Sequence, residues 1–204
     1  MPSPTELASL IRQKAGGALR YMVGIAGPPG AGKSTIAEAL RESLVAQGES
    51  AIVVPMDGFH FDDAVLNARG HRPRKGAPFT FDVAGFEVLL KRIKAREPDI
   101  AIPVFDRSME LARAGADIVT DEAKFILVEG NYLLLQQPPW NQLMPLFDFT
   151  VFIAVPEAEL ERRLMQRWSD HGFDVTYARN WIASNDMLNI RAVQSGSAKA
   201  DLVI

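Results

Sequence analysis

The chain has 204 residues, of which 48% are hydrophobic and 23% are charged, a balance typical of one globular α/β domain. The net charge of −3 argues against a general nucleic-acid-binding protein, and the absence of cysteine excludes disulfides and thiolate metal sites. The N-terminus lacks the basic start and apolar core of a secretory signal, and no apolar run is long enough to span a bilayer. We therefore expect a cytoplasmic protein that binds neither membrane nor nucleic acid.

In chain order, compact apolar runs alternate with segments of helical periodicity. The apolar runs predict buried strands at Tyr21–Ala26, Ala51–Pro55, 125–128, 149–155 and 200–204. The periodic segments predict a helix capped by Thr5 and ended by Gly16, a helix over 33–47, a helix capped by Asp82 and ended by Pro98, and helices over 156–168 and 176–190. This alternation predicts a parallel sheet covered on both faces, and such sheets bind ligands at the carboxyl ends of their strands.

The segment Gly27-Pro28-Pro29-Gly30-Ala31-Gly32-Lys33-Ser34 follows a predicted strand and opens a predicted helix, which is the context of a P-loop. Glycines let the backbone N–H groups converge on phosphates, and the helix N-terminus adds partial positive charge. We expect Lys33 to reach the β- and γ-phosphates of ATP and Ser34 to bind Mg²⁺, with Thr35 in the first helical turn. The alternative is a plain glycine-rich turn.

Two acidic residues end predicted strands near this loop. Asp57 follows the strand Ala51–Pro55, where its carboxylate would face the γ-phosphate, orient an acceptor hydroxyl, take its proton and approach the metal. Glu129 follows the apolar run 125–128 in a Walker B pattern, which predicts a Mg²⁺ contact, directly or through water. Each acid has an alternative interpretation as a turn or cap residue.

Polar and aromatic residues near the same strand ends are candidates for acceptor binding. The candidate substrate contacts are His60, Arg74, Asp82, Phe105, Asp106, Arg107, Asn131 and Tyr132. Three alternatives stay open: the basic loop 69–75 as a solvated surface, Asp82 as a helix cap, and 103–107 as an ion pair in a small hairpin. Tyr132 fits the core equally well.

Arg163 and Arg167 lie four residues apart on one predicted helix and therefore share a face. Such a pair can close over the transferring phosphate as catalytic residues of a lid. The alternative is a charged helix surface, because three glutamates lie nearby, at Glu157, Glu159 and Glu161.

These residues together resemble the family of uridine kinase, phosphoribulokinase and bacterial pantothenate kinase, from about Tyr21 to the C-terminus. The resemblance rests on the P-loop, Asp57-Gly58-Phe59, Phe81-Asp82, Pro103-x-Phe105-Asp106, Val128-Glu129-Gly130 and the two lid arginines. It implies an α/β P-loop NTPase fold of three layers, with a five-stranded parallel sheet, helices on both faces and a small mobile lid. It also implies ATP, Mg²⁺ and Asp57 as the base.

The whole pattern looks most similar to short bacterial proteins labelled as fructose-transport-system kinases. Uridine and pantothenate kinases place a histidine shortly after the segment equivalent to 103–106, whereas this chain has no histidine between His71 and His171. We therefore expect a single kinase domain over 1–204, with a substrate-covering segment at about 58–120 and a lid at about 157–175. Its activity would be transfer of the γ-phosphate to a hydroxyl of a sugar or sugar-like metabolite.

A pantothenate or uridine kinase is the alternative on the same scaffold, and a regulatory nucleotide-binding ATPase is the alternative of another class. A GTPase switch is disfavoured because no guanine-reading Asn-Lys-x-Asp segment is present. The expected partner is a small hydroxyl acceptor, and a homodimer is compatible with the sequence.

Overall fold

The computed structural model describes residues 2–170, 172 and 174–204. Its central sheet has the strand order β2-β5-β1-β6-β7, and every neighbouring pair is parallel. The strands are β1 (Tyr21–Ala26), β2 (Ala51–Pro55), β5 (Phe125–Gly130), β6 (Phe149–Phe152) and β7 (Leu202–Val203). The predicted five-stranded parallel sheet is therefore confirmed, with the last two strands shorter than expected.

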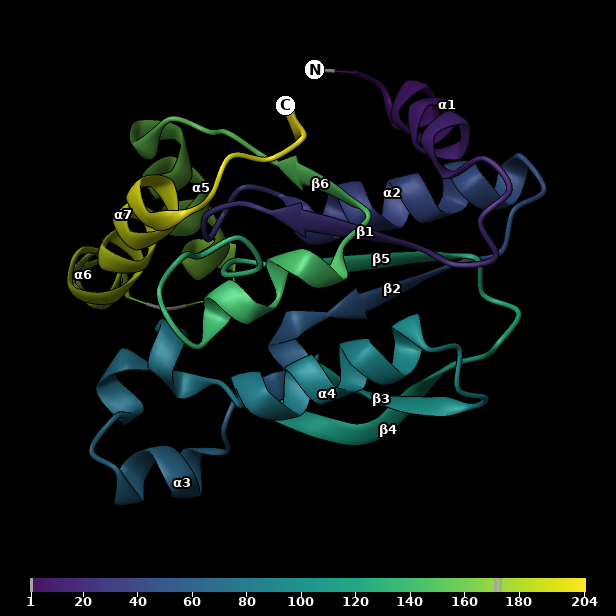
Figure 1. Ribbon diagram of the computed structural model, residues 1–204. Coiled ribbons are helices and arrows are strands. Elements are labelled where there is room, and N and C mark those ends of the chain that lie inside the picture. The colour runs from purple at the N-terminus through teal and green to yellow at the C-terminus, as the bar shows by residue number, and fades with distance from the viewer. Residues whose placement is uncertain (1, 171, 173) are drawn as a thin grey trace.

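Helices cover both faces of this sheet (Figure 1). They are α1 (Pro4–Ala15), α2 (Lys33–Ala46), α3 (Asp63–Ala68), α4 (Val83–Lys94), α5 (Glu157–Asp170), α6 (Val175–Trp181) and α7 (Met187–Gly196). Alternation along β1 decides the layers, since Met22 packs into one core with Phe86 of α4, whereas Val23 packs into the other with Leu40 of α2. The three-layer arrangement thus follows from strands that are apolar on both sides.

Short helical turns complete the secondary structure. The 3₁₀ turns are Met56–Phe59, Arg72–Arg74, Pro78–Thr80, Trp140–Gln142 and Met144–Leu146, and a π turn covers Ile182–Asp186. The helix predicted over 176–190 is therefore interrupted, because the π turn separates α6 from α7.

Two predicted helix ends are wrong. Helix α1 begins two residues earlier than predicted, because Ser3 and not Thr5 is the N-cap. Ser3 accepts a hydrogen bond from the Glu6 N–H, while the Glu6 carboxylate accepts one from the Ser3 N–H. Helix α4 ends at Lys94, well before Pro98, since Arg96 takes a left-handed φ of 58°.

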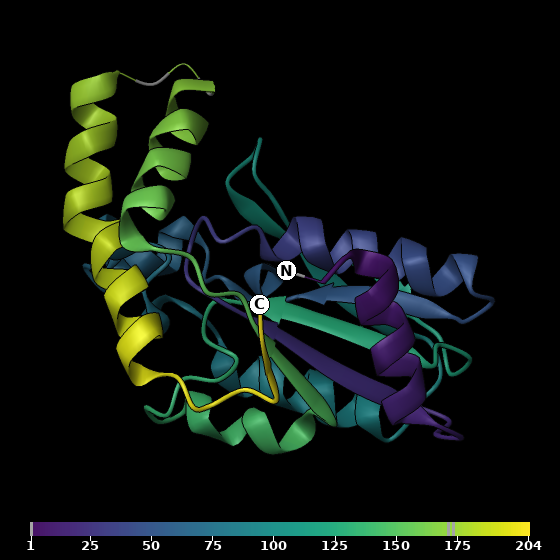
Figure 2. The ribbon, with the colours of Figure 1, turned by 90° about the horizontal axis from the view of Figure 1, so that it is seen from above.

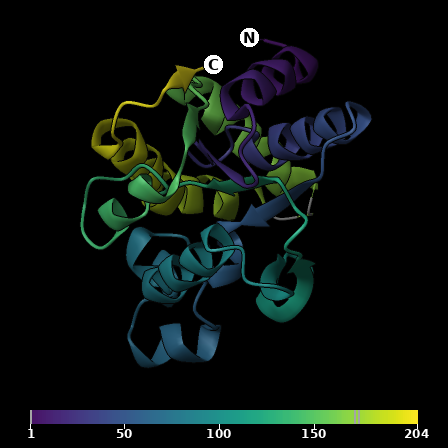
Figure 3. The same cartoon turned by 45° about the vertical axis from the view of Figure 1, so that its right-hand side comes forward.

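The segment between β2 and β5 lies below the sheet in Figures 1 and 3. It contains α3, α4 and an antiparallel hairpin of β3 (Ile100–Asp106) and β4 (Leu111–Val119), of which β4 was not predicted. Arg20, just before β1, donates hydrogen bonds to the carbonyls of Ile93, Thr120 and Asp121 at 2.7–3.0 Å. This contact, the Arg20 clamp, ties the base of the hairpin and α4 to the sheet.

Helices α5 and α6 stand side by side and project from the rest of the molecule (Figure 2). They contain the predicted lid at about 157–175, of which His171 and Phe173 lie outside the described residues. Among the described residues, no helix combines the length and apolar character needed to cross a membrane.

Candidate active site

The turn between β1 and α2 has the backbone geometry of a phosphate cradle. Gly30 and Gly32 have φ values of 81° and 91°, a region of backbone conformation that residues other than glycine rarely adopt. Helix α2 begins at Lys33, and no side chain caps its N-terminus. The first N–H groups of the helix are therefore left for a ligand, and together with the helix dipole they favour an anion.

Lys33 is buried beneath this turn. Its Nζ donates a hydrogen bond to the carbonyl of Pro28 at 3.1 Å. Burial lowers the pKa of Lys33, and the carboxylates of Glu129 and Asp57 act in the opposite direction. The Lys33 ammonium group is thus held beside the P-loop backbone, on the wall of the cavity.

Ser34, Glu129 and Asp57 form a donor set that fits Mg²⁺. The Ser34 hydroxyl donates to Glu129 Oε1 at 3.0 Å, and Glu129 is buried at the end of β5. Burial raises the pKa of Glu129, and the neighbouring negative charge of Asp57 raises it further. Two neighbouring carboxylates beside one hydroxyl suit a divalent cation that also binds nucleotide phosphates. The residues predicted as metal contacts are therefore brought together.

Asp57 lies in the 3₁₀ turn directly after β2, and Arg107 at the tip of the hairpin reaches it. The Arg107 guanidinium is 2.9 Å from Asp57 Oδ2. The hairpin also packs on the next residue, because a Cβ on Gly58 would lie 2.7 Å from the carbonyl carbon of Pro103. Glycine at position 58 thus allows the hairpin to lie against the turn that carries Asp57.

A cavity of ≈ 780 Å³ joins the P-loop to the substrate-covering segment. It is lined on the nucleotide side by Pro29, Gly30, Gly32, Lys33, Ser34, Thr35 and Glu129, and on the other side by residues that include Asp57, His60, Phe105, Arg107 and Asn131. This volume is in the range of small-molecule sites. The structure therefore places the predicted nucleotide site and several predicted acceptor contacts around one space.

One wall of the cavity is aromatic. The His60 ring lies 4.0 Å from the Phe81 ring and 4.9 Å from the Phe105 ring, centroid to centroid. His60 Nδ1 is 2.9 Å from the carbonyl of Asp57, and burial lowers the pKa of the imidazole. A neutral imidazole with a hydrogen bond to the Asp57 backbone gives this wall one polar edge.

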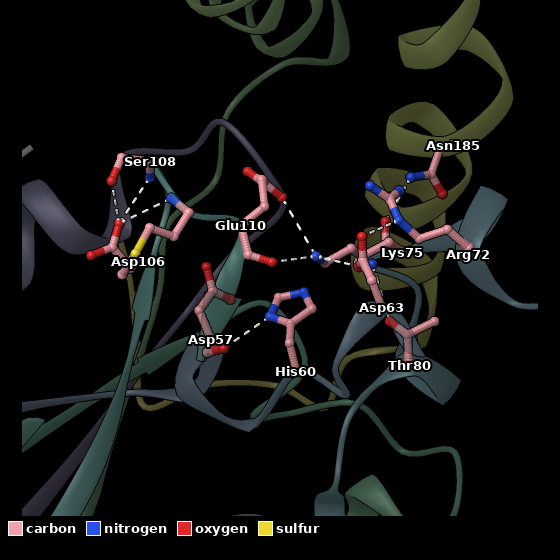
Figure 4. Close-up of polar contacts among 12 residues, drawn as sticks. Asp57, His60, Asp63, Arg72, Lys75, Thr80, Asp106, Ser108, Glu110 and Asn185 are labelled. Atoms are coloured by element: carbon pink, nitrogen blue, oxygen red, sulfur yellow. Dashed lines mark hydrogen bonds and ion pairs between the residues drawn. The ribbon is translucent and has the colours of Figure 1, made fainter. Parts of the chain in front are cut away.

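The basic loop 69–75 is fixed to the protein through Lys75 (Figure 4). Lys75 is buried, and its Nζ donates to Asp63 Oδ1 at 2.7 Å and to the carbonyl of Glu110 at 2.8 Å. Arg72 forms an ion pair with the same Asp63 at 2.6 Å. Both cations line the cavity, yet their charges are paired within the protein.

The two lid arginines differ in their contacts. Arg163 forms an ion pair with Glu159 at 2.7 Å and points toward the P-loop carbonyls of Gly30 and Ala31 at 3.4–3.5 Å. Arg167 lines the cavity and has no hydrogen bond or ion pair with another described residue. Arg167 is therefore the better placed of the two to meet a phosphoryl group.

Four predicted substrate contacts do not line the cavity. Asp82 caps α4 by accepting from the Gly85 N–H, which bears out the cap interpretation. Asp106 accepts from the Ser108 hydroxyl within the hairpin turn (Figure 4). Tyr132 is fully buried and donates to the carbonyl of Gly76 at 2.6 Å, and Arg74 donates to Asn185 and Asn189.

The cavity also has walls that sequence reasoning missed. They comprise Gly76, Phe81, Ser108, Glu110, Leu164, Trp168, Tyr177, Trp181, Asp186 and Asn189, whereas Arg72 and Lys75 belong to the basic loop 69–75 that was a candidate. Tyr177 and Trp181 stack at 6.4 Å between ring centroids on α6. Their spacing of four residues on one helix is the signal that could have indicated a shared aromatic face.

Comparison with known proteins agrees with this geometry. A family model for the methylmalonyl-CoA mutase-associated GTPase MeaB matches residues 2–60, the part that contains the P-loop. The "Uncharacterized protein YggC" of Escherichia coli K12 is 36% identical over 91% of this chain and 77% of its own. The "Putative uridine kinase C227.14" of Schizosaccharomyces pombe is 31% identical over 91% of this chain and 83% of its own. The crystal structure titled "putative fructose transport system kinase" from Silicibacter sp. TM1040 is 40% identical, covers 100% of both chains and has a TM-score of 0.94.

The fold, the P-loop and the two acidic residues Asp57 and Glu129 define the class of this protein, which is a P-loop phosphotransferase with a hydroxyl acceptor. Within that class, the chain belongs to the P-loop kinase family that includes uridine kinase. Kinases of this class use ATP, generally with Mg²⁺.

Proposed function

We propose that this protein is an ATP-dependent kinase whose acceptor is a neutral sugar or sugar-like polyol. The observation that carries the proposal is the pairing of charges on the acceptor side of the cavity. Arg72 and Lys75 are paired with Asp63, and Arg107 is paired with Asp57. Among the described residues lining the cavity, Lys33 and Arg167 are the cations without a carboxylate partner, and the phosphates of the nucleotide would occupy both.

This balance separates the candidate acceptors. An acceptor that carries a carboxylate or phosphate needs an uncompensated cation, and the paired side chains would have to give up their partners to supply one. A neutral polyol exchanges hydrogen bonds with charged pairs without separating them. The paired charges thus favour a sugar over pantothenate. The name of the kinase from Silicibacter points in the same direction.

In the proposed reaction, Asp57 orients the acceptor hydroxyl and takes its proton as the oxygen attacks the γ-phosphorus, and the bond to the β-γ bridging oxygen of ATP breaks. Lys33 exchanges the Pro28 carbonyl for phosphate oxygens, and Arg167 stabilises the charge on the transferred group. Ser34, Glu129 and Asp57 would hold Mg²⁺, which supplies further neutralisation of the phosphates when bound. Arg163 is the second candidate, after Arg167, for stabilising the charge on the transferred group.

The test is a coupled assay of ATP consumption with purified protein and a panel of D-fructose, D-ribose, glycerol, pantothenate and uridine. We expect a neutral sugar to stimulate turnover, and Asp57→Asn to reduce that turnover by about 10²–10⁴-fold with unchanged ATP affinity. Lys33→Ala should abolish turnover with the fold intact. Preferential use of pantothenate or uridine would contradict the sugar proposal. Slow ATP loss that no acceptor changes would favour a regulatory ATPase.

A further inference from the structure

The Asp57 carboxylate and the His60 imidazole reach the cavity from one short turn. Asp57 is the second residue of the 3₁₀ turn Met56–Phe59, and His60 directly follows that turn. Side chains three residues apart in a 3₁₀ turn project in the same direction, and Figure 4 shows these two side chains pointing the same way. Both residues line the cavity. An acceptor whose hydroxyl meets Asp57 therefore brings its neighbouring atoms to the His60 ring.

The backbone of Asp57 fixes the orientation and the tautomer of this ring. The Asp57 carbonyl accepts hydrogen bonds from His60 Nδ1 at 2.9 Å and from the His60 backbone N–H at 3.2 Å. Because a carbonyl oxygen only accepts, Nδ1 carries the proton. Burial lowers the pKa of the imidazole, Asp57 acts in the opposite direction, and the nearby cations Lys75 and Arg107 lower it again. The ring is therefore neutral near pH 7, and Nε2 carries a lone pair.

His60 Nε2 is a hydrogen-bond acceptor that the protein leaves unused. It has no partner among the described residues, and it keeps accessible surface on a side chain that lines the cavity. Figure 4 shows this nitrogen on the side of the ring that faces away from the Asp57 carbonyl. The ammonium group of Lys75 does not donate to it, because Lys75 Nζ donates to Asp63 and to the carbonyl of Glu110. The acceptor atom is thus available to a ligand.

The surroundings of His60 Nε2 select the chemistry of that ligand. A carboxylate has no proton to donate, and its lone pairs would meet the lone pair of the nitrogen. An ammonium donor would approach the cations of Lys75 and Arg107, which both act on the ring. A neutral hydroxyl donates without either cost. The rings of Phe81 and Phe105, at 4.0 and 4.9 Å from the imidazole, offer an apolar surface to the C–H groups beside such a hydroxyl.

We propose that His60 Nε2 accepts a hydrogen bond from a second hydroxyl of the acceptor, beside the hydroxyl that Asp57 deprotonates. This inference rests on the proposed function, and it narrows the acceptor to a neutral compound with at least two hydroxyl groups close to each other. It also makes His60 a specificity-determining residue. The competing interpretation is that the ring only packs between Phe81 and Phe105.

The tautomer can be tested without any acceptor. Long-range ¹H–¹⁵N NMR correlation spectra of protein labelled with ¹⁵N-histidine distinguish the ring nitrogens, because a protonated and an unprotonated nitrogen differ widely in chemical shift. The chain has three histidines, so the signals that His60→Gln removes belong to His60. We expect Nδ1 to be protonated and Nε2 to be unprotonated at pH 7.5. The opposite tautomer, or an imidazolium, would overturn the inference whether or not the protein is a kinase.

Two substitutions separate the roles of the two ring nitrogens. The amide of His60→Asn lies near the position of Nδ1 and can still donate to the Asp57 carbonyl, whereas the amide of His60→Gln lies near the position of Nε2 and can still accept. Binding of D-fructose, D-ribose and their single-deoxy analogues is measured by ligand-observed NMR with a non-hydrolysable ATP analogue present, and phosphorylation is measured separately. His71→Gln is the matched control, since His71 does not line the cavity, and thermal melts verify folding.

We expect one deoxy analogue to bind wild type about tenfold more weakly than its parent. His60→Gln and His71→Gln should keep this ratio, and His60→Asn should bring it close to one. A ratio that His60→Asn leaves unchanged would overturn the inference, as would equal binding of all analogues to wild type or no binding of any sugar. Loss of the ratio in His60→Gln as well would assign it to the position of the ring and overturn the role of Nε2. Discrimination that depends on His60, without phosphoryl transfer by wild type, would sustain the polyol site and refute the kinase reaction on that compound.

Discussion

The contact between Gly58 and the β3–β4 hairpin can be tested by adding a single methyl group. In Gly58→Ala, the new Cβ would lie 2.7 Å from the carbonyl carbon of Pro103 and 3.1 Å from its Cγ. The first of these neighbours is backbone, which cannot rotate away as a side chain would. The hairpin must therefore move away from the turn that carries Asp57.

The size of the effect follows from that distance. Carbon atoms pack best at about 3.5–4.0 Å, so the two segments must separate by about 1 Å. Overpacking of this kind costs about 1–3 kcal/mol. For a chain of 204 residues, each kcal/mol lowers Tm by about 2–4 °C. The expected loss is about 2–12 °C in Tm, and a displacement of about 1 Å beside Asp57 can lower turnover by about 10²-fold.

The assay pairs a thermal melt with steady-state ATP turnover in the presence of the best acceptor of the panel. Gly17→Ala is the control, since a Cβ there has no atom within 4 Å and the backbone is not in the left-handed region. An equal Tm and an equal rate of ATP turnover in Gly58→Ala and Gly17→Ala would refute the predicted displacement of the hairpin. A loss of stability with full activity would mean that the position of the hairpin does not control Asp57.

Three other predictions follow from the ion pairs and the buried acids. Arg107→Ala releases Asp57 from a half-exposed ion pair worth up to about 1 kcal/mol, so ATP hydrolysis without acceptor should rise by up to about fivefold. Unchanged hydrolysis, or an equal rise in the hairpin control Arg113→Ala, would contradict this prediction. Burial raises the pKa of Asp186 to about 6, so the folded state binds this proton more tightly than the unfolded state, and stability falls as pH rises from about 4 to above 6. Asp186→Asn should therefore stabilise the ligand-free protein by on the order of 2 kcal/mol at pH 7.5, with no gain below about pH 4 in thermal melts. Glu129→Gln should raise the Mg²⁺ concentration for half-maximal turnover by about tenfold or more, and an unchanged Mg²⁺ titration would remove Glu129 from the metal site.

The nucleotide half of the site could be predicted because its geometry is local. A P-loop is a contiguous segment, and its glycine positions correspond directly to the observed backbone angles at Gly30 and Gly32. Asp57 and Glu129 are far apart in the chain, yet both lie at the carboxyl ends of neighbouring parallel strands, and such strand ends meet at one edge of the sheet. Their proximity therefore followed from strand assignment alone.

The acceptor half could not be predicted, because its contacts join distant segments that lack periodic signals. Strand β4 is largely exposed and pairs only with β3, so it has no apolar pattern to reveal it. Lys75 donates hydrogen bonds to Asp63 of α3 and to the carbonyl of Glu110 in the hairpin turn, and no sequence spacing connects these segments. Asp186 reaches the cavity through a π turn, whereas a regular helix was expected there.

The Arg20 clamp constrains how the two halves of the cavity can approach each other. It pins the base of the hairpin and the end of α4 to the central sheet, and the contact at Gly58 holds the hairpin at Pro103, in the middle of β3. These contacts fix the hairpin against the turn that carries Asp57. We propose that any narrowing of the cavity comes from the other side, the projecting helices α5 and α6, of which α5 carries Arg167 (Figure 2).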